Sequence, residues 1–120
     1  MKLLITSTGK TLESDVDPRF GRAQFFILYD TESEEFSVVD NVQSFNQPSG
    51  AGIQAAQNVV ESGAEAVISG NCGPKAFKVL SAAGLKVYLC SEGTVKEAIE
   101  KYKKGNLVES VNANVQGHWM

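Results

Sequence analysis

The fold is decided by Ala66-Val-Ile-Ser-Gly-Asn-Cys-Gly-Pro-Lys-Ala-Phe-Lys-Val-Leu-Ser-Ala-Ala-Gly-Leu-Lys-Val-Tyr-Leu89. Residues 66–68 and 85–89 are short apolar runs of the kind found in buried strands. Between them, apolar residues recur at helical spacing until Gly84 supplies a stop. A helix that joins two strands in this way is a crossover connection, which predicts parallel strands and an α/β fold.

The chain before this crossover has a different rhythm. Its first strand is the apolar run 3–5, and a second strand rich in aromatic and β-branched residues spans 24–30. The polar cluster 31–35 is typical of a hairpin turn and leads into a third strand at 36–40. We therefore expect these three strands to form an antiparallel meander.

Two further helices are expected. The first follows the meander, carries Ile53, Ala56 and Val60 on one face, and stops at Gly63. The last begins with a capping box at 94–97 and ends at Gly105. Its expected buried face is formed by Val95, Ala98, Ile99 and Tyr102.

This order of elements predicts a three-layer α/β fold with a five-stranded mixed sheet. The spatial order 3-2-1-4-5, with strand two antiparallel, satisfies the rules for short and right-handed connections. Strands one and four then meet where the connections diverge, and open α/β sheets bind ligands at such a point. Three loops would gather there, namely 7–22, 43–52 and 70–74.

Composition limits the class of protein. The chain has 120 residues, 42% of them hydrophobic, and a formal net charge of -3. This length suits one domain, expected over residues 1–108, with a C-terminal tail over 109–120 that shows no helical period. The Lys and Arg residues are scattered, which argues against a nucleic-acid partner. The N-terminal apolar run is too short for a signal peptide or a membrane span, so we expect a cytoplasmic protein without membrane contact.

The loop after the first strand contains Asp17-Pro-Arg-Phe-Gly-Arg-Ala23, with two arginines three residues apart beside a glycine. Guanidinium groups present a planar fork of donors suited to anions, and glycine lets a ligand approach the backbone. An anionic ligand is therefore one interpretation. In the alternative, Arg19 pairs with Asp15 or Asp17 to fix the loop while Phe20 fills the core.

The turn Gly70-Asn-Cys-Gly-Pro74 ends a strand and opens a helix. At a helix N-terminus the dipole favours a thiolate, so we expect a lowered pKa for Cys72 and a role as nucleophile or metal ligand. The alternative is a small buried residue in a tight turn. Cys90 ends the neighbouring strand, and either approaches Cys72 at the same rim or packs in the core.

Two other features concern ligand binding. The glycines of Gln47-Pro-Ser-Gly-Ala-Gly52 could expose backbone N–H groups to an anion, although the segment is not a P-loop because no Gly-Lys-Ser or Gly-Lys-Thr follows it. The alternative is a flexible connector. His118 is the one histidine, and it is either a metal ligand folded back onto the domain or a solvated residue of the tail.

Four motifs occur in order along the chain, and they are listed here with two later residues: Asp17-Pro-Arg-Phe-Gly-Arg-Ala23, Ser49-Gly-Ala-Gly52, Gly70-Asn-Cys-Gly-Pro-Lys-Ala76 and Thr94-Val-Lys-Glu-Ala98, with Tyr102 and Gly105. Together they resemble the dinitrogenase iron-molybdenum cofactor biosynthesis family, which includes NifX, NafY and the C-terminal domain of NifB. The resemblance covers residues 1–107. It implies a ribonuclease-H-like fold and a nitrogen-fixation-related protein that binds or carries a metal-sulfur cluster.

The same resemblance implies a site and partners. The ligand would be the iron-molybdenum cofactor or another iron-sulfur or mixed-metal cluster, bound transiently and exchanged with donor and acceptor proteins. Cys72 is the candidate metal ligand, with His118 as a second. The residues expected to face the cluster are Arg19, Phe20, Gly21, Arg22, Gly50, Gly52, Asn71, Cys72 and Gly73.

Three functions are compatible with these residues. The first, which we favour, is a non-catalytic cluster carrier. The second is a small thiol enzyme in which Cys72 attacks an anionic substrate and Arg19 or Arg22 stabilises developing charge, although no base for Cys72 is evident. The third is a protein-interaction adaptor that shares the fold alone.

Overall fold

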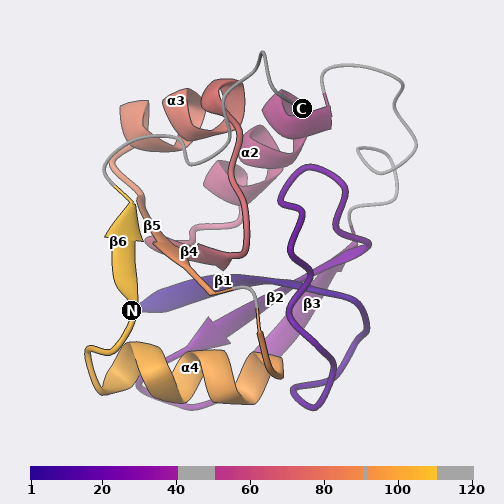
Figure 1. Ribbon diagram of the computed structural model, residues 1–120, viewed down its shortest axis with the longest axis vertical. Coiled ribbons are helices and arrows are strands. Elements are labelled where there is room, and N and C mark those ends of the chain that lie inside the picture. The colour runs from indigo at the N-terminus through magenta and orange to yellow at the C-terminus, as the bar shows by residue number, and fades with distance from the viewer. Residues whose placement is uncertain (41–50, 91, 111–120) are drawn as a thin grey trace.

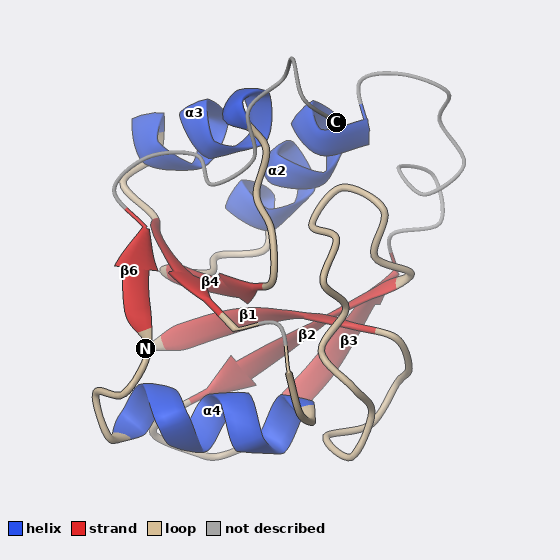
Figure 2. Ribbon diagram, viewed as in Figure 1, coloured by secondary structure: helices blue, strands red, loops and turns tan. Residues whose placement is uncertain are grey.

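The computed structural model describes residues 1–40, 51–90 and 92–110 of the chain. A mixed sheet forms the middle layer, with α2 and α3 on one face and α4 on the other (Figure 1, Figure 2). The predicted three-layer α/β fold is confirmed. The elements are β1 (Lys2–Ser7), β2 (Phe25–Asp30), β3 (Phe36–Asp40), α2 (Ala51–Glu61), β4 (Ala66–Ser69), α3 (Pro74–Ala82), β5 (Lys86–Leu89), α4 (Val95–Lys103) and β6 (Val108–Ser110).

The strand order is β3-β2-β1-β4-β5-β6, so the predicted order 3-2-1-4-5 is confirmed. β2 is antiparallel to β1 and β3, whereas β1, β4 and β5 are mutually parallel. Over the described residues the sheet nevertheless has six strands rather than the predicted five. Residues 109 and 110, expected to open the tail, belong to β6, which pairs antiparallel with β5. The sequence shows no alternation of buried and exposed residues here, because the strand has three residues and Val108 is 71% exposed. The strand pairs with β5 through its backbone.

The two faces of the sheet carry separate cores. Alternate residues of each strand point to opposite faces, so Leu4 and Val67 pack toward α2 and α3 while Ile5 and Ile68 pack toward α4. In α2 the buried stripe is Ala55, Ala56 and Val59, and not the predicted Val60, which is exposed. The small residues of this stripe lie on the side of α2 that faces α3 and the sheet.

The loop between β1 and β2 wraps around the end of the sheet where β1 finishes (Figure 1). It places Val16 in the core beneath α4 and Phe20 in the core beneath α2 and α3. The loop also completes the start of α4, because the carbonyl oxygens of Ser14 and Leu12 accept hydrogen bonds from the backbone N–H groups of Val95 (2.8 Å) and Lys96 (2.9 Å).

α4 begins as predicted. The Thr94 hydroxyl accepts from the backbone N–H of Glu97, and the Glu97 carboxylate accepts from the backbone N–H of Thr94. Both residues of this capping box satisfy donors that a helix start would otherwise leave without partners. Hydrogen bonds to Thr94 lower the pKa of Glu97. The N-terminus of α4 is therefore fully engaged by its own cap and by the long loop.

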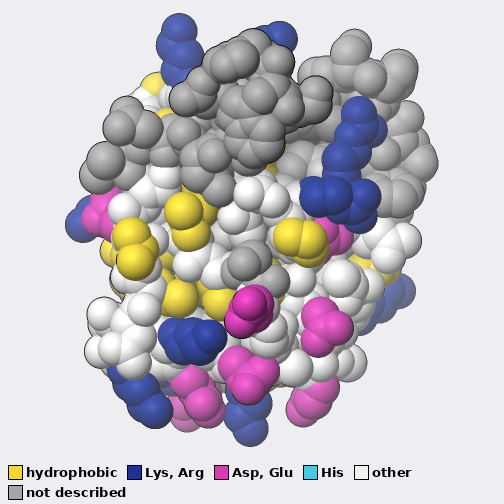
Figure 3. All heavy atoms as spheres, in the orientation of Figure 1, with side chains coloured by type: hydrophobic (Ala, Val, Ile, Leu, Met, Phe, Trp, Pro, Cys, Tyr) yellow, Lys and Arg dark blue, Asp and Glu magenta, His cyan; other side chains and the backbone are white. Residues whose placement is uncertain are grey.

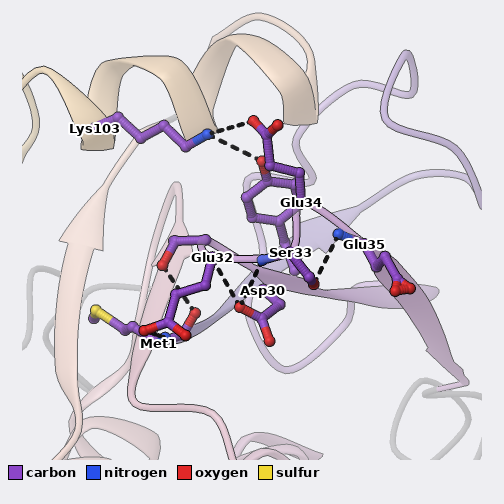
Figure 4. A network of polar contacts seen from close by, with 9 residues as sticks. Met1, Asp30, Glu32, Ser33, Glu34, Glu35 and Lys103 are labelled. Carbon is purple, nitrogen blue, oxygen red and sulfur yellow. Dashed lines mark hydrogen bonds and ion pairs between the residues drawn. The ribbon is translucent and has the colours of Figure 1, made fainter.

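A polar network lies at the opposite end of the strands, where β1 begins (Figure 4). Lys103 donates to the hydroxyl of Tyr29 (3.0 Å) and to the carboxylate of Glu34 (3.3 Å), and the carbonyl of Met1 accepts from the backbone N–H of Thr31 (2.9 Å). The hydrogen bonds that Lys103 donates to Tyr29 and Glu34 raise the pKa of Lys103. These contacts fasten the β2–β3 turn to α4 and to the chain start, on the side away from the candidate loops.

Within the described residues, no helix has the length and apolar character that crossing a bilayer requires.

Candidate functional site

Two of the three loops expected at the switch point meet in the structure. Arg19 and Asn71 form an isolated parallel bridge, which joins the loop after β1 to the turn after β4. Beside this bridge the contact is so close that a Cβ atom added to Gly70 would lie 2.6 Å from the Cα of Pro18. Only glycine allows the two backbones to approach in this way. The third loop, 43–52, lies outside the described residues up to position 50.

Arg19 is held by its neighbour Asp17. The Asp17 carboxylate oxygen Oδ1 accepts from the backbone N–H of Arg19 at 2.9 Å and from its Nε at 3.3 Å. The alternative interpretation, in which Arg19 pairs with Asp15 or Asp17, is confirmed for Asp17. The pairing does not hide the arginine, because 57% of its side chain remains exposed. Arg19 is thus both fixed and accessible.

Phe20 does not face the rim as the resemblance implied. Its side chain is 2% exposed and stacks on Phe26 with ring centroids 5.7 Å apart. The alternative in which Phe20 fills the core therefore holds for this residue. An aromatic ring between two arginines can serve either role, and the sequence does not say which way the side chain turns.

The two cysteines lie on opposite faces of the sheet. Cys72 packs in the core beneath α2 and α3, whereas Cys90 packs in the core beneath α4 and donates its thiol to the carbonyl of Glu92 at 3.3 Å. The suggested approach of Cys72 and Cys90 at one rim is therefore wrong, and Cys90 is a core residue. The error came from strand spacing, because two adjacent strand ends can still send their side chains to different faces.

Cys72 sits at the start of α3 as expected, but its environment is not that of an activated thiol. The side chain is 1% exposed, and burial raises the pKa of Cys72 to about 12. Loss of hydration on burial disfavours the charged thiolate. The expectation of a lowered pKa is wrong for the protein as described.

This burial predicts slow chemical modification of Cys72. Under native conditions, iodoacetamide should leave Cys72 unmodified from pH 7 to pH 9, because alkylation needs an accessible thiolate. In urea the same cysteine should react quickly. Because the folded pKa of about 12 lies above the ordinary thiol value of 9.0, the contribution of Cys72 to stability is retained below pH 9 and lost as pH rises toward about 12. Peptide mass spectrometry measures the modification, and rapid native alkylation of Cys72 would contradict the buried placement.

The start of α3 differs from that of α4. Its N-cap is Gly73, which provides no side-chain hydrogen bond, and Pro74 occupies the first turn. The preceding turn is held from within the sheet, where the buried hydroxyl of Ser69 donates to the carbonyl of Asn71 at 3.2 Å. Backbone N–H groups at such a terminus attract anions. The exposed Asn71 lies directly beside Arg19 at this end of α3.

The other predicted site residues fall into two groups. Gly21 and Arg22 are half-buried in the loop after β1, and Figure 3 shows Lys and Arg side chains gathered over this loop. Gly52 belongs to the first turn of α2, where an added Cβ would lie 3.5 Å from Ala76. Gly50 and His118 lie outside the described residues. Among the described residues, no group of three or more His, Cys, Asp or Glu side chains is arranged to hold a metal ion.

Sequence reasoning did not identify two features of this site. One is the contact between Gly70 and Pro18, which joins positions far apart in the sequence. The other is the double anchoring of Asp17, whose N–H donates to the carbonyl of Thr6 at 2.9 Å and whose carbonyl accepts from the Thr6 hydroxyl at 2.7 Å. An aspartate two residues before an arginine is a local signal for the Asp17–Arg19 contact, but it indicates neither of these two features.

Comparison with known proteins gives concordant matches. The family model described as dinitrogenase iron-molybdenum cofactor matches residues 1–105. A protein of Methanocaldococcus jannaschii of uncharacterized function is 30% identical over 95 residues, which cover 77% of this chain and 80% of that protein. The apo form of the orange protein from Desulfovibrio gigas superposes with a TM-score of 0.92 at 39% identity, covering 95% of this chain and 96% of that one. A Thermotoga protein described as NifB of the DUF35 family gives a TM-score of 0.81 at 41% identity, with 95% and 98% covered.

Proposed function

Because the chain belongs to the dinitrogenase iron-molybdenum cofactor family, we propose that it binds a metal-sulfur cluster and carries it between proteins. The binding surface is the rim, which we define as Arg19, Gly21 and Arg22 of the loop after β1 together with Asn71 and Gly73 of the turn before α3. The cluster is the iron-molybdenum cofactor or another iron-sulfur or mixed-metal cluster. Donor and acceptor proteins of the cytoplasm would supply and receive it.

One observation carries this proposal. Arg19, with 57% of its side chain exposed, lies beside Asn71 at the start of a helix whose N-cap makes no side-chain hydrogen bond. Metal-sulfur clusters are anions with acceptor atoms on their surface. A guanidinium fork and a helix N-terminus both favour such a ligand, and each gains strength where the backbone holds it in place.

The remaining residues have narrower roles in the proposal. Arg22 adds a second positive charge, while Gly21, Gly73 and the glycines at 50 and 52 allow a bulky ligand to approach the backbone. The Cys72 thiol would become a metal ligand only after the turn before α3 opens, because it is buried and protonated at neutral pH. His118 stays a predicted second ligand.

We infer a carrier rather than an enzyme. The thiol-enzyme alternative needs a reactive thiolate, and the burial of Cys72 with its raised pKa counts against one. The adaptor alternative does not explain why Arg19, an exposed arginine, is anchored.

The proposal is tested by anaerobic titration of the protein with two synthetic clusters, one iron-sulfur and one molybdenum-iron-sulfur, followed by visible absorbance and metal analysis. The wild type should take up one of them, and Arg19→Gln should weaken binding by about tenfold, the effect of losing a charge-assisted hydrogen bond.

The matched control is Lys101→Gln, which removes the same charge from the exposed last turn of α4. It should change the affinity less than about twofold, because α4 lies on the face of the sheet opposite to α3 and salt screens exposed charges. Equal losses in the two variants would remove the rim from the proposal. A wild type that takes up neither cluster would overturn the carrier function.

A further inference from the structure

The carboxylate of Asp17 is unfavourably placed for a site that binds an anion. It lies at a rim proposed to bind an anion, and its side chain is only 3% exposed. A buried negative charge repels an anionic ligand and is costly to desolvate unless it is paired. The contacts of Asp17 show what offsets that cost.

The backbone fixes the position of this carboxylate. Asp17 is joined to Thr6 of β1 by two hydrogen bonds, N–H to carbonyl at 2.9 Å and hydroxyl to carbonyl at 2.7 Å. Thr6 is itself fully buried in the sheet. Asp17 is therefore a rigid extension of β1 rather than a residue of a loose loop.

From that position the carboxylate holds Arg19 at two points, its backbone N–H and its Nε. The guanidinium group is planar and has five donors, of which Nε supplies one. Because Nε is held, rotation of the guanidinium plane is restricted, and the other four donors lie on the two terminal nitrogens. The side chain as a whole remains 57% exposed. Such preorganisation removes the entropic cost of ordering a long side chain when the ligand arrives.

We propose that Asp17 is a positioning residue, which orients the Arg19 guanidinium so that its terminal nitrogens bind the anionic cargo. This inference rests on the proposed function and assigns the rim its geometry. Asp17 itself does not touch the ligand. The negative charge of Asp17 is unfavourable for anion binding, and the preorganised Arg19 guanidinium offsets that effect.

Electrostatics and positioning predict opposite results for Asp17→Asn. Removing a negative charge near the rim should tighten binding of an anion if charge alone matters. If positioning matters, the amide loses the charged partner of Nε, and binding of the synthetic cluster that the wild type takes up should weaken by about tenfold. Asp15→Asn is the matched control, because it removes the same charge from an exposed position of the same loop. Asp15→Asn should leave the affinity unchanged or slightly tighter.

A double-mutant cycle separates positioning from a general loss of loop structure. In the Asp17→Asn background, Arg19→Lys should have little further effect, since the fork is already released, while Arg22→Lys should weaken binding as much as it does in the wild type. Binding by Asp17→Asn that equals or exceeds the wild type would overturn the inference. So would additive losses from Asp17→Asn and Arg19→Lys.

A measurement without any cluster makes the test independent of the proposed function. The Nε–H proton of Arg19 should exchange slowly with water in the wild type and in Asp15→Asn, and rapidly in Asp17→Asn, as observed by 15N NMR. If the wild type takes up no cluster but shows this pattern, the carrier function fails and the positioning of Arg19 stands. Exchange that is equally fast in all three proteins would overturn the positioning itself.

Discussion

Replacing Phe20 by alanine should lower the free energy of unfolding by about 3–5 kcal/mol, the cost of removing a large aromatic side chain from a packed core. Phe20 is 2% exposed and stacks on Phe26, so its removal leaves a cavity beneath α2 and α3. Urea denaturation followed by circular dichroism measures the change.

The control for this substitution is Phe36→Ala on edge strand β3, where the phenylalanine is 41% exposed. Its cost should be about 1 kcal/mol or less, because much of the ring already contacts water. The variant Phe20→Leu adds a functional comparison. It keeps a buried apolar side chain, and cluster uptake should therefore persist. Loss of uptake in a folded Phe20→Leu protein would instead return Phe20 to the ligand-facing role that the family resemblance implied.

Replacing Gly70 by alanine should destabilise the protein by about 1–3 kcal/mol, the range seen when a packed site is overfilled. The added methyl group would lie 2.6 Å from the Cα of Pro18, and a backbone atom cannot move aside as a flexible side chain can. The turn after β4 and the loop after β1 must then separate. We expect the bridge between Arg19 and Asn71 to weaken, together with cluster uptake, as measured by thermal unfolding and by titration.

Gly52→Ala provides the matched control for the change in stability. The new methyl group would meet Ala76 at 3.5 Å, an ordinary contact, inside a helix where alanine is favoured over glycine by up to about 1 kcal/mol. Gly52→Ala should therefore be neutral or slightly stabilising. If Gly70→Ala were equally harmless, the close approach of the two loops would not be a constraint on the fold.

The arrangement of the sheet could be predicted from the sequence because it follows from local patterns and a few rules of connection. The crossover over residues 66–89 fixed the parallel part, and the polar turn at 31–35 fixed the meander. β6 could not be predicted, since three mostly exposed residues pair with β5 through their backbone alone. The choice of Val60 for the buried face of α2 was off by one residue, a small error in a helix whose buried stripe is partly alanine.

The candidate site was predicted in outline but not in the direction of its side chains. Motif position correctly brought Arg19 and Asn71 together, because both follow parallel strands that meet at the switch point. Whether a side chain enters the core or the solvent depends on packing that no local motif encodes. For this reason the sequence left two alternatives open for Cys72, a reactive residue or a buried residue in the turn, and the structure buries it. The pairing of Arg19 with Asp17 was likewise one of two alternatives that the sequence left open.

The loop between β1 and β2 joins the two cores of the protein. It inserts Val16 on one side of the sheet and Phe20 on the other. Ahead of Val16, its backbone carbonyls at Leu12 and Ser14 accept hydrogen bonds from the first turn of α4. The contact with Gly70 and the hydrogen bonds to α4 are thus made by one continuous loop. In the proposed carrier, an opening that releases the cargo would therefore draw on the free energy that keeps α4 docked.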